Sequence, residues 1–325
     1  MSSKVLITGG AGFIGYHLGK SLAENGYQVT LCDNLSRGKM DGELQRLCQQ
    51  GSVQFITCDL TQTDGLNKLE RDYAQVYHLA AINGTRYFYE MPHQVLRVNT
   101  LALINLLDWF IDTDCGKILF ASSSEVYAGT ARAFGVPIPS PEDLCLSVDN
   151  VYNPRLSYAG SKIIGELFLI NYSKVYKFPM TIIRYHNIYG PRMGYEHVIP
   201  EFCLRILKRN EPFAIHGGAE SRAFCYIDDA IRATRLAMES ANTENEILHI
   251  GNPDEEITIA ELANKMFDLF DFHPSVDIAP APEGCVNRRC PDIAKLTKLT
   301  GYKPEVDLVE GLEKTFNWYK DESKL

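Results

Sequence analysis

The sequence contains no uninterrupted apolar run of the length that a bilayer span requires, which is about 20 predominantly apolar residues. Its first 15 residues carry a single lysine before a glycine-rich turn begins, and this does not match the basic, apolar and small-residue order of a secretory signal. We therefore expect neither a membrane-spanning helix nor a secretory signal.

Paired cysteine motifs are also missing. The nine cysteines include no C-x-x-C pair and no zinc-type ligand spacing. They are odd in number and are scattered from Cys32 to Cys290, as is typical of free thiols in a reducing compartment. We expect unpaired cysteines, no metal site and a cytoplasmic location.

The chain has no excess of basic residues. It carries 32 Lys and Arg against 41 Asp and Glu, a net charge of −9, and its pI is about 5.4. This balance argues against nucleic acid or a membrane surface as a general partner, so any anionic ligand must be held by a local group of basic side chains. With 325 residues, 45% hydrophobic and 22% charged, the chain is long enough for one large globular domain or two unequal ones.

Three glycines at three-residue spacing are the most informative feature. Gly9, Gly12 and Gly15 follow a short apolar run at residues 5–7, which is typical of a strand buried on both faces. In a phosphate-binding turn, the first glycine allows a tight turn, the second lets the backbone approach a pyrophosphate, and the third lets the helix pack on the strand. The amino end of that helix then points at the anion.

A carboxylate follows at the position that such a turn requires. The apolar run 28–32 ends in Asp33, about 20 residues after the glycines, where a carboxylate meets an adenosine ribose. A carboxylate there repels a 2′-phosphate, so it favours NAD over NADP, although Arg37 lies close by. The alternative is a strand, a turn and a helix that bind no ligand.

Two further apolar runs, at 53–58 and 75–79, predict a third and a fourth strand. Asp59 follows the first of these, placed either to reach an adenine edge or to cap a helix. Ala80 and Ala81 follow the second, and their small side chains would let a flat cofactor lie on the backbone. Because strands alternate with helical stretches, we predict an α/β fold with a doubly wound parallel sheet.

A run of serines follows the predicted fifth strand. Apolar periodicity predicts a helix over residues 94–111, and the strand at 117–121 then delivers Ser122, Ser123, Ser124 and Glu125 at its carboxyl end, where open parallel sheets bind ligands. A turn with a helix cap is the alternative interpretation. Residues 128–153 contain three prolines and little periodicity, so we predict a loop that covers a substrate pocket.

Tyr158 and Lys162 lie four residues apart in a predicted helix over 157–176, and therefore on one face of it. An isolated tyrosine has a pKa near 10, so a tyrosine base near neutral pH requires its anion to be stabilised by roughly 4 kcal/mol. A lysine one turn away and a cationic nicotinamide would supply that. A plain surface contact is the alternative for a pair at this spacing.

Taken in order, these motifs resemble the extended short-chain dehydrogenase/reductase family, in its nucleotide-sugar epimerase/dehydratase branch. The resemblance covers nearly the whole chain and includes the segments 184–192, 222–229 and 288–292. It implies that residues 1–180 form an NAD-binding Rossmann domain, to which some later segments return. It also implies that residues 181–325 mainly form a smaller α/β domain that binds a nucleotide-diphosphate sugar.

The resemblance assigns roles to individual residues. The catalytic residues that it implies are Ser123, Glu125, Tyr158 and Lys162. The cofactor-binding residues that it implies are Gly9, Gly12, Phe13, Ile14, Gly15, Asp33, Asn34, Asp59, Leu60, Leu79, Ala80, Ala81, Asn99, Tyr158 and Lys162. The substrate-binding residues that it implies are Ser124, Asn187, Arg192, Val198, Arg222 and Arg289.

Some of these roles leave alternatives open. Asn187, Arg222 and one of Arg288 and Arg289 would hold the diphosphate, which needs guanidinium groups in an acidic protein, and surface salt bridges are the alternative for the arginines. Phe213 and Ile215 either pack on the base or belong to a strand core. His186 either lines the nicotinamide pocket or is a hydrogen-bonded core histidine.

The resemblance implies a reaction that begins by oxidation at C4 of the sugar. Tyr158, as a phenolate, removes the C4 hydroxyl proton while hydride passes to NAD, Ser123 shares that hydroxyl, and a 4-keto sugar results. A 4-epimerase then returns the hydride to the other face, and this is the reaction that we expect.

Other outcomes of the same first step remain open. A 4,6-dehydratase needs an acid and a base, and Ser124 stands where many relatives carry the acid, although Glu125 remains. A decarboxylase needs only a sugar carboxylate, which Arg192 would orient, and a net 4-dehydrogenase would release the ketone. A non-catalytic NAD(H) sensor is the alternative from another class.

By analogy with the family, we expect a homodimer. Members commonly pair through the helix that carries the Tyr/Lys motif and the helix before the catalytic strand. Here the apolar surface would come from Leu103, Leu106, Phe168 and Tyr172.

Overall fold

The five predicted apolar strands join two further strands, β6 and β11, in one seven-stranded parallel sheet. The computed structural model describes residues 3–281 and 286–322. The order across the sheet is β11-β6-β5-β4-β1-β2-β3, and every pair of neighbours is parallel. This confirms the predicted Rossmann-type α/β fold. The strands are β1 Lys4–Thr8, β2 Gln28–Asp33, β3 Val53–Thr57, β4 Gln75–His78, β5 Lys117–Ser123, β6 Met180–Tyr185 and β11 Glu246–Ile250.

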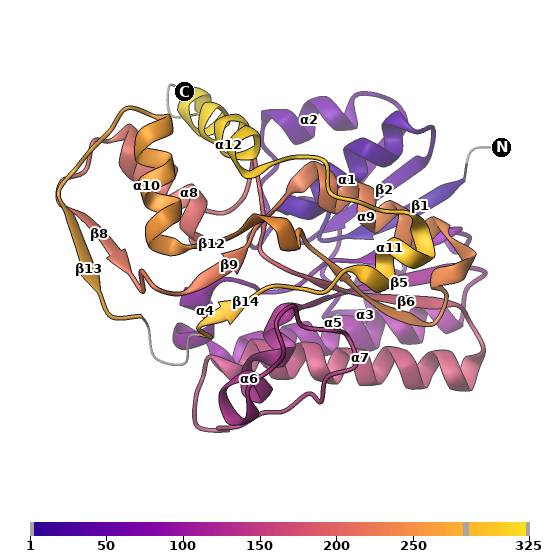
Figure 1. The fold of residues 1–325 in the computed structure, drawn as a ribbon. Coiled ribbons are helices and arrows are strands. Elements are labelled where there is room, and N and C mark those ends of the chain that lie inside the picture. Colours follow the sequence, from indigo (N-terminus) through magenta and orange to yellow (C-terminus); the bar gives the residue numbers. More distant parts are fainter. Residues whose placement is uncertain (1–2, 282–285, 323–325) are drawn as a thin grey trace.

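Helices cover both faces of the sheet (Figure 1). Successive residues of β1 enter two different cores: Val5 and Ile7 pack with α1 (Phe13–Glu24) and α9 (Ile227–Glu239), whereas Leu6 packs with α5 (Pro92–Ile111) and α7 (Leu156–Tyr176). Since side chains alternate along a strand, two apolar faces require an unbroken apolar run. That is the pattern which the sequence shows at residues 5–7.

The segment 128–153 differs from the prediction of a continuous loop. Residues Ala128–Phe134 form the short helix α6, which ends at Gly135 with a φ of 72°. These seven residues include three alanines and an arginine, which favour a helix, and the prolines that suggested a loop come only after Gly135.

Outside the large sheet, the later part of the chain forms three small sheets. β7 Ile188–Tyr189 pairs with β10 Cys225–Tyr226, and β8 Phe213–His216 pairs with β13 Val276–Ala279. β9 Ser221–Ala223 lies between β12 Glu256–Thr258 and β14 Arg288–Arg289. In Figure 1 the pair β8 and β13 lies at one end of the molecule, together with α8 Val198–Leu207 and α10 Ile259–Leu269.

The remaining elements are short, apart from the long C-terminal helix. They are α2 Gly42–Cys48, α3 Thr63–Leu66, α4 Thr85–Glu90, α11 Ala294–Thr300, α12 Leu308–Glu322 and the 3₁₀ turns η1 Ser124–Tyr127, η2 Ala241–Thr243 and η3 Pro253–Glu255. Across residues 3–281 and 286–322, none of the helices has the length and apolar character that a bilayer span needs. The eight cysteines in these ranges are free thiols.

The packing of the cores bears on two expectations from the sequence, the role of Phe213 and Ile215 and the surface at which two copies would pair. Phe213 and Ile215 are fully buried with other aromatic residues, so they belong to a strand core. Leu103 and Leu106 are also fully buried, under the sheet, which corrects their expected place on an exposed dimer surface. The reason is that these residues lie on the face of α5 that meets the sheet. Phe168 and Tyr172 are partly buried against the same core.

Gly15 provides a test of the packing between α1 and the glycine turn. A Cβ atom at this position would lie 2.2 Å from the carbonyl oxygen of Gly9 and 2.9 Å from the Cα atom of Gly10. We expect Gly15→Ala to lower the free energy of unfolding by roughly 1–3 kcal/mol through overpacking. Gly194→Ala is the control, because a Cβ there meets no atom within 4 Å. Urea denaturation of both variants measures the effect, and equal stabilities would contradict this packing.

Candidate functional site

The glycine turn forms a cradle between β1 and α1. Gly9 has a φ of 74°, and a Cβ on it would lie 2.8 Å from the backbone nitrogen of Ala80, so the turn packs closely on the segment after β4. Gly12 is the N-cap of α1 and supplies no capping side chain. The first backbone amides of α1, from Phe13 and Ile14, therefore have no capping side chain as acceptor and can donate to a bound anion.

Asp33 is held beside this turn by backbone donors. Its Oδ2 accepts a hydrogen bond from the amide of Ala11 at 3.1 Å, and its Oδ1 accepts one from the amide of Leu35 at 2.8 Å. Burial raises the pKa of Asp33, and these hydrogen bonds oppose the rise. An anion cradle and a fixed carboxylate at the ends of neighbouring strands fit the pyrophosphate and the ribose of a dinucleotide.

Asn99 joins the loop after β4 to the helix α7. Its Oδ1 accepts from the amide of Ile82 at 2.7 Å, and its Nδ2 donates to the hydroxyl of Ser161 at 3.1 Å. The amide of Asn99 therefore holds the edge of the predicted cofactor site in place.

The other predicted cofactor residues lie near the carboxyl ends of the strands. Asp59 Oδ1 accepts from both the amide and the hydroxyl of Thr61, whereas the N-cap of α3 is Gln62, so the helix-cap alternative for Asp59 is wrong. Asn34 holds a local turn through Ser36, and Leu60 is buried with its carbonyl bonded to Asn105. Phe13, Ile14, Leu79, Ala80 and Ala81 are partly buried.

Ser123, Tyr158 and Lys162 come together at the end of β5. Ser123 is the last residue of β5, and its hydroxyl accepts from the amide of Glu125 at 3.2 Å while lying within hydrogen-bond reach of Tyr158. Lys162 Nζ donates to the carbonyl of Ala121 at 2.7 Å and lies 5.7 Å from the centre of the Tyr158 ring. Both residues of the pair are buried, so a plain surface contact is excluded.

Burial shifts the proton affinities of this pair in opposite directions. It raises the pKa of Tyr158, against the hydrogen bond from Ser123, and it lowers the pKa of Lys162 to about 7, against the charge of Glu166. Desolvation always disfavours the charged form, which is the phenolate for tyrosine and the ammonium for lysine. Tyr158 therefore needs additional positive charge nearby before it can act as a base.

Glu125 is the centre of a buried ionic cluster. Its Oε1 accepts from Arg289 Nη1 at 2.7 Å and from Arg155 Nη2 at 3.2 Å. Burial alone would raise the pKa of Glu125, but the two guanidinium groups outweigh it and lower this pKa to about 2. Glu125 is therefore ionised at neutral pH and cannot act as a proton donor there. No motif pointed to Arg155, because its contact with Glu125 depends on where the start of α7 meets η1.

Arg192 forms its ion pairs with carboxylates other than Glu125. Its Nη2 lies 2.5 Å from Oδ2 of Asp41 and its Nε lies 3.3 Å from Oε2 of Glu43, while its guanidinium stacks 3.9 Å above the centre of the Tyr16 ring. Tyr16 lies in α1, Glu43 in α2, and Asp41 is the N-cap of α2, and the packing of these helices against the segment after β7 was not visible in the sequence. The arrangement does not support Arg192 as the group that orients a sugar carboxylate.

Arg222 and Arg289, which are expected at the diphosphate, lie opposite each other on neighbouring strands of one small sheet. Arg222 in β9 pairs with Arg289 in β14, and Asn187 donates from Nδ2 to the carbonyl of Ala223 at 3.3 Å. Arg288 instead forms a two-point ion pair with Glu256 and is exposed, so Arg289 is the inward-facing arginine of the two. Val198, the first residue of α8, packs against the core.

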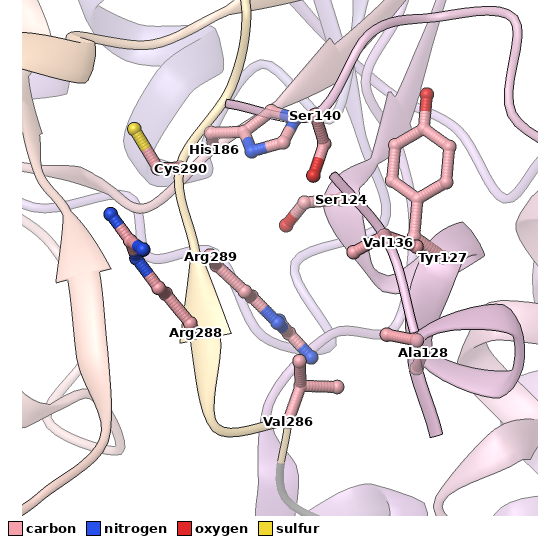
Figure 2. Close-up of a pocket in the computed structure, with 11 residues that line it drawn as sticks. Ser124, Tyr127, Ala128, Val136, Ser140, His186, Val286, Arg288, Arg289 and Cys290 are labelled. Atoms are coloured by element: carbon pink, nitrogen blue, oxygen red, sulfur yellow. The ribbon is translucent and has the colours of Figure 1, made fainter. Parts of the chain in front are cut away.

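A small cavity lies beside Ser124, and Figure 2 shows side chains of η1, α6 and β14 around it. His186, Ser124 and Arg289 are among the residues that line it. His186 is buried, and neither of its ring nitrogens has a hydrogen-bond partner among the described residues. The alternative of a hydrogen-bonded core histidine is therefore wrong.

Comparison with known proteins agrees with this geometry. The model of the NAD dependent epimerase/dehydratase family matches residues 5–251. A UDP-N-acetyl-alpha-D-glucosaminuronate decarboxylase of Bacillus cytotoxicus is 33% identical, with 99% of each chain covered. A UDP-glucuronate 4-epimerase of Thermodesulfobacterium geofontis is 30% identical, with 98% of this chain and 97% of the relative covered.

A solved structure is similar over the same extent. The UDP-glucuronic acid 4-epimerase from Bacillus cereus, in complex with UDP-glucuronic acid and NAD, superposes with a TM-score of 0.87 at 31% identity. The alignment covers 98% of this chain and 99% of that chain.

The ionic cluster of Glu125 generates a prediction about acid stability. Because the folded-state pKa of Glu125 is about 2 against an ordinary value of 4.5, its stabilising contribution is present above pH 4.5 and is lost as the pH falls towards 2. The full contribution is roughly 3 kcal/mol. We expect Glu125→Gln to be less stable than the wild type at pH 7 and to lose less stability between pH 5 and pH 3.

Urea denaturation at pH 7, 5, 4 and 3 measures this difference. Glu201→Gln is the matched control, because Glu201 forms an exposed ion pair with Arg205 and such pairs contribute little. Parallel stability curves for the wild type and Glu125→Gln would contradict the assignment.

Proposed function

The chain belongs to the NAD-dependent epimerase/dehydratase family, and on that basis we propose that it is a nucleotide-sugar 4-epimerase that works through oxidation at C4. The observation that carries this proposal is the buried group of Ser123, Tyr158 and Lys162 at the end of β5. It lies on the edge of the sheet at which the glycine turn and Asp33 form a dinucleotide cradle.

The chain's own residues divide the first step between them. Tyr158, as a phenolate, takes the proton of the C4 hydroxyl, and Ser123 hydrogen-bonds to the same hydroxyl. Lys162 places a positive charge near Tyr158 that favours the phenolate. NAD, when bound, supplies the hydride acceptor, so the sugar becomes a 4-ketone.

The state of Glu125 favours epimerisation over dehydration. A 4,6-dehydratase must protonate the departing C6 hydroxyl, yet Glu125 is ionised and bound by two arginines, and Ser124 is a weak acid. Epimerisation needs no further acid or base, because the ketone only has to turn over before hydride returns to its other face.

Decarboxylation is the second candidate, and the cluster of Glu125, Arg155 and Arg289 favours it. Two guanidinium groups converge on one carboxylate oxygen, so a carboxylate at C5 of a sugar could take either of them as its partner. A 4-keto sugar with such a carboxylate is a β-keto acid, which loses CO₂ without a further catalyst. Under this alternative, Arg289 takes the role that the sequence suggested for Arg192.

We assign the nucleotide to UDP, because the relatives are named for UDP-sugars. Asn187, Arg222 and Arg289 come from the small sheets and from the segment that leads into them, where guanidinium groups can hold a diphosphate in an acidic protein. This supports a division in which residues 1–180, with segments that return to the large sheet, bind NAD, and residues 181–325 mainly bind the sugar nucleotide.

We also assign the protein to the cytoplasm. The eight described cysteines are free thiols, and six of them lie in or against the apolar cores. Thiols persist in reducing compartments.

Product analysis tests the reaction directly. The purified protein is incubated with UDP-glucose, UDP-glucuronate and their N-acetylated, dTDP- and GDP-linked counterparts, with product mass and reduced-nicotinamide absorbance followed together. We expect an isomer of unchanged mass and no net NADH from at least one UDP-sugar. Loss of CO₂ would replace the epimerase by the decarboxylase, and a lack of turnover with every sugar would contradict both.

Tyr158→Phe is the control for chemistry in this assay. Loss of the proton acceptor should reduce kcat by roughly 10²–10⁴-fold. Binding of NAD, followed by fluorescence, should stay close to that of the wild type. Undiminished turnover by the variant would exclude Tyr158 as the base.

We further propose a homodimer, through the exposed apolar face of α5 and α7. Leu96, Ile164 and Leu167 are 39%, 38% and 57% exposed on these helices, which pack side by side. An exposed apolar strip on two neighbouring helices suits pairing with a second copy into a four-helix interface.

Leu167→Arg tests the dimer, because it places a charge in the centre of this strip. We expect the wild type to have twice the chain mass of 36.6 kDa in light scattering, and the variant to have the mass of one chain. Val309→Arg, at a position 36% exposed on α12, is the control and should remain dimeric. A wild type of single-chain mass would exclude this interface.

A further inference from the structure

His186 is a buried polar side chain with no hydrogen-bond partner, at the wall of the cavity beside Ser124. Its backbone is fixed, because its amide donates to the carbonyl of Ile250 at 2.8 Å and a Cβ on Gly251 would lie 3.0 Å from its own Cβ. Both ring nitrogens lack a partner among the described residues. A buried polar group that remains unpaired costs stability, so its presence calls for an explanation.

The ring that packs against His186 cannot supply the missing partner. His249 lies with its ring centre 4.6 Å from that of His186. Its Nδ1 donates to the carbonyl of Asp292 at 3.1 Å, and its Nε2 accepts from the hydroxyl of Tyr127 at 2.7 Å. Because a carbonyl can only accept, the tautomer of His249 is fixed and both of its nitrogens are occupied.

His186 itself is a neutral imidazole. Burial lowers its pKa well below the ordinary value, and the neighbouring His249, Arg289 and Arg184 lower it further. A neutral imidazole offers one N–H donor and one acceptor nitrogen. The ring can therefore donate to, or accept from, a neutral polar group without a change in charge.

The same cavity contains a second unpaired donor. Nη2 of Arg289 is buried and has no partner among the described residues, although Nη1 binds Glu125. Ser124 lies between this arginine and His186 (Figure 2). The free volume of the cavity is about 20 Å³, which is room for one small substituent and not for a second ring.

We propose that His186, together with Nη2 of Arg289, binds an oxygen on the sugar substituent next to C4 and so determines which sugars the site accepts. This inference rests on the proposed function. That function places the C4 hydroxyl on Ser123 and Tyr158, and Ser124 is the next residue along the chain. The substituents next to C4 that carry oxygen are the C3 hydroxyl and the C6 group.

The unpaired nitrogens explain why such a site would discriminate. A sugar that lacks the oxygen leaves the buried imidazole and guanidinium unpaired in the complex, whereas an oxygenated sugar pairs both. Sites built to hydrogen-bond a substrate oxygen reject analogues without it much more strongly than apolar pockets reject a missing methylene. Only a sugar with the matching oxygen thus supplies the hydrogen bonds that these buried nitrogens lack in the free protein.

Calorimetric binding to a Tyr158→Phe background, in which the chemistry is blocked, provides the test. The ligands are UDP, UDP-glucose, UDP-3-deoxyglucose and UDP-6-deoxyglucose. We expect one deoxy sugar to bind roughly 10- to 100-fold more weakly than UDP-glucose, and which of the two it is identifies the oxygen. His186→Phe in this background should remove most of that preference while leaving the affinity for UDP unchanged.

Further variants separate recognition from folding. His186→Phe should unfold at the same temperature as its parent or higher, because it removes an unpaired buried polar group, and His186→Leu replaces it if the larger ring does not fit. His186→Asn keeps a donor and an acceptor and should retain part of the preference. Ser140→Ala is the matched control, because Ser140 lines the same cavity but its hydroxyl already donates to the carbonyl of Pro137 at 2.8 Å.

Two results would overturn the inference. If both His186→Phe and His186→Leu keep the full preference between UDP-glucose and the deoxy sugars, His186 does not bind the oxygen. If UDP binds but no sugar adds to its affinity in the parent, the proposed function fails and the inference fails with it.

Discussion

The buried ion pair between Arg184 and Glu166 holds α7, the helix of Tyr158 and Lys162, on the sheet. Arg184 Nε and Nη2 lie 2.8 Å and 2.6 Å from the two carboxylate oxygens of Glu166, and both side chains are almost fully buried. The hydroxyl of Ser122 also donates to Glu166, at 2.5 Å. Such a pair adds little net stability, but removal of one partner leaves a buried charge that costs about 3–5 kcal/mol. Glu166 lies one turn after Lys162 in α7, and Ser122 directly precedes Ser123 in β5, so these bonds fix the two catalytic elements relative to each other.

The same guanidinium also orders one wall of the cavity that Tyr127 and His186 line. Nη1 of Arg184 donates to the hydroxyl of Tyr127 and, at 2.8 Å, to the carbonyl of Glu142. Tyr127 then donates to His249, and His249 donates to Asp292, so one chain of hydrogen bonds runs from the large sheet to the segment after β14. Each side chain in this series of hydrogen bonds has a partner. The neighbouring His186 lines the cavity, and its ring nitrogens have no partner among the described residues. Because the nitrogens of His249 and the hydroxyl of Tyr127 already have partners, these two neighbours leave the imidazole of His186 unpaired.

The sequence predicted the parts of this molecule that depend on short spacings. The glycine turn, Asp33 and the Tyr158–Lys162 pair are defined by intervals of three, four and about twenty residues along one strand and helix, and these intervals map directly onto local geometry. The parallel, doubly wound character of the sheet followed from the alternation of strands with helices. The features that the sequence did not reveal depend on which surfaces meet in three dimensions. Arg192 carries the charge needed for a substrate carboxylate, but the packing of α1 and α2 brought Asp41 and Glu43 to it first. Leu96, Leu103 and Leu106 are all apolar residues of α5, but Leu96 is exposed and the other two are fully buried. The packing of α5 against the sheet and α7 decides this difference, and the sequence pattern does not show it.

Burial is the main cause of the pKa shifts of both Tyr158 and Lys162. Burial raises the pKa of Tyr158 and lowers that of Lys162 to about 7, so near neutral pH the lysine is only partly charged and the tyrosine stays protonated. Lys162 Nζ donates to the carbonyl of Ala121 and forms no ion pair with an acidic residue in the part of the chain that the structure describes. A positive charge entering this desolvated space therefore acts strongly on Tyr158, because the surrounding protein screens it poorly. An oxidised nicotinamide carries such a charge and its reduced form does not. In the reaction that we propose, NAD would therefore lower the pKa of Tyr158 while the sugar is oxidised, and its reduction would raise this pKa again when Tyr158 returns the proton.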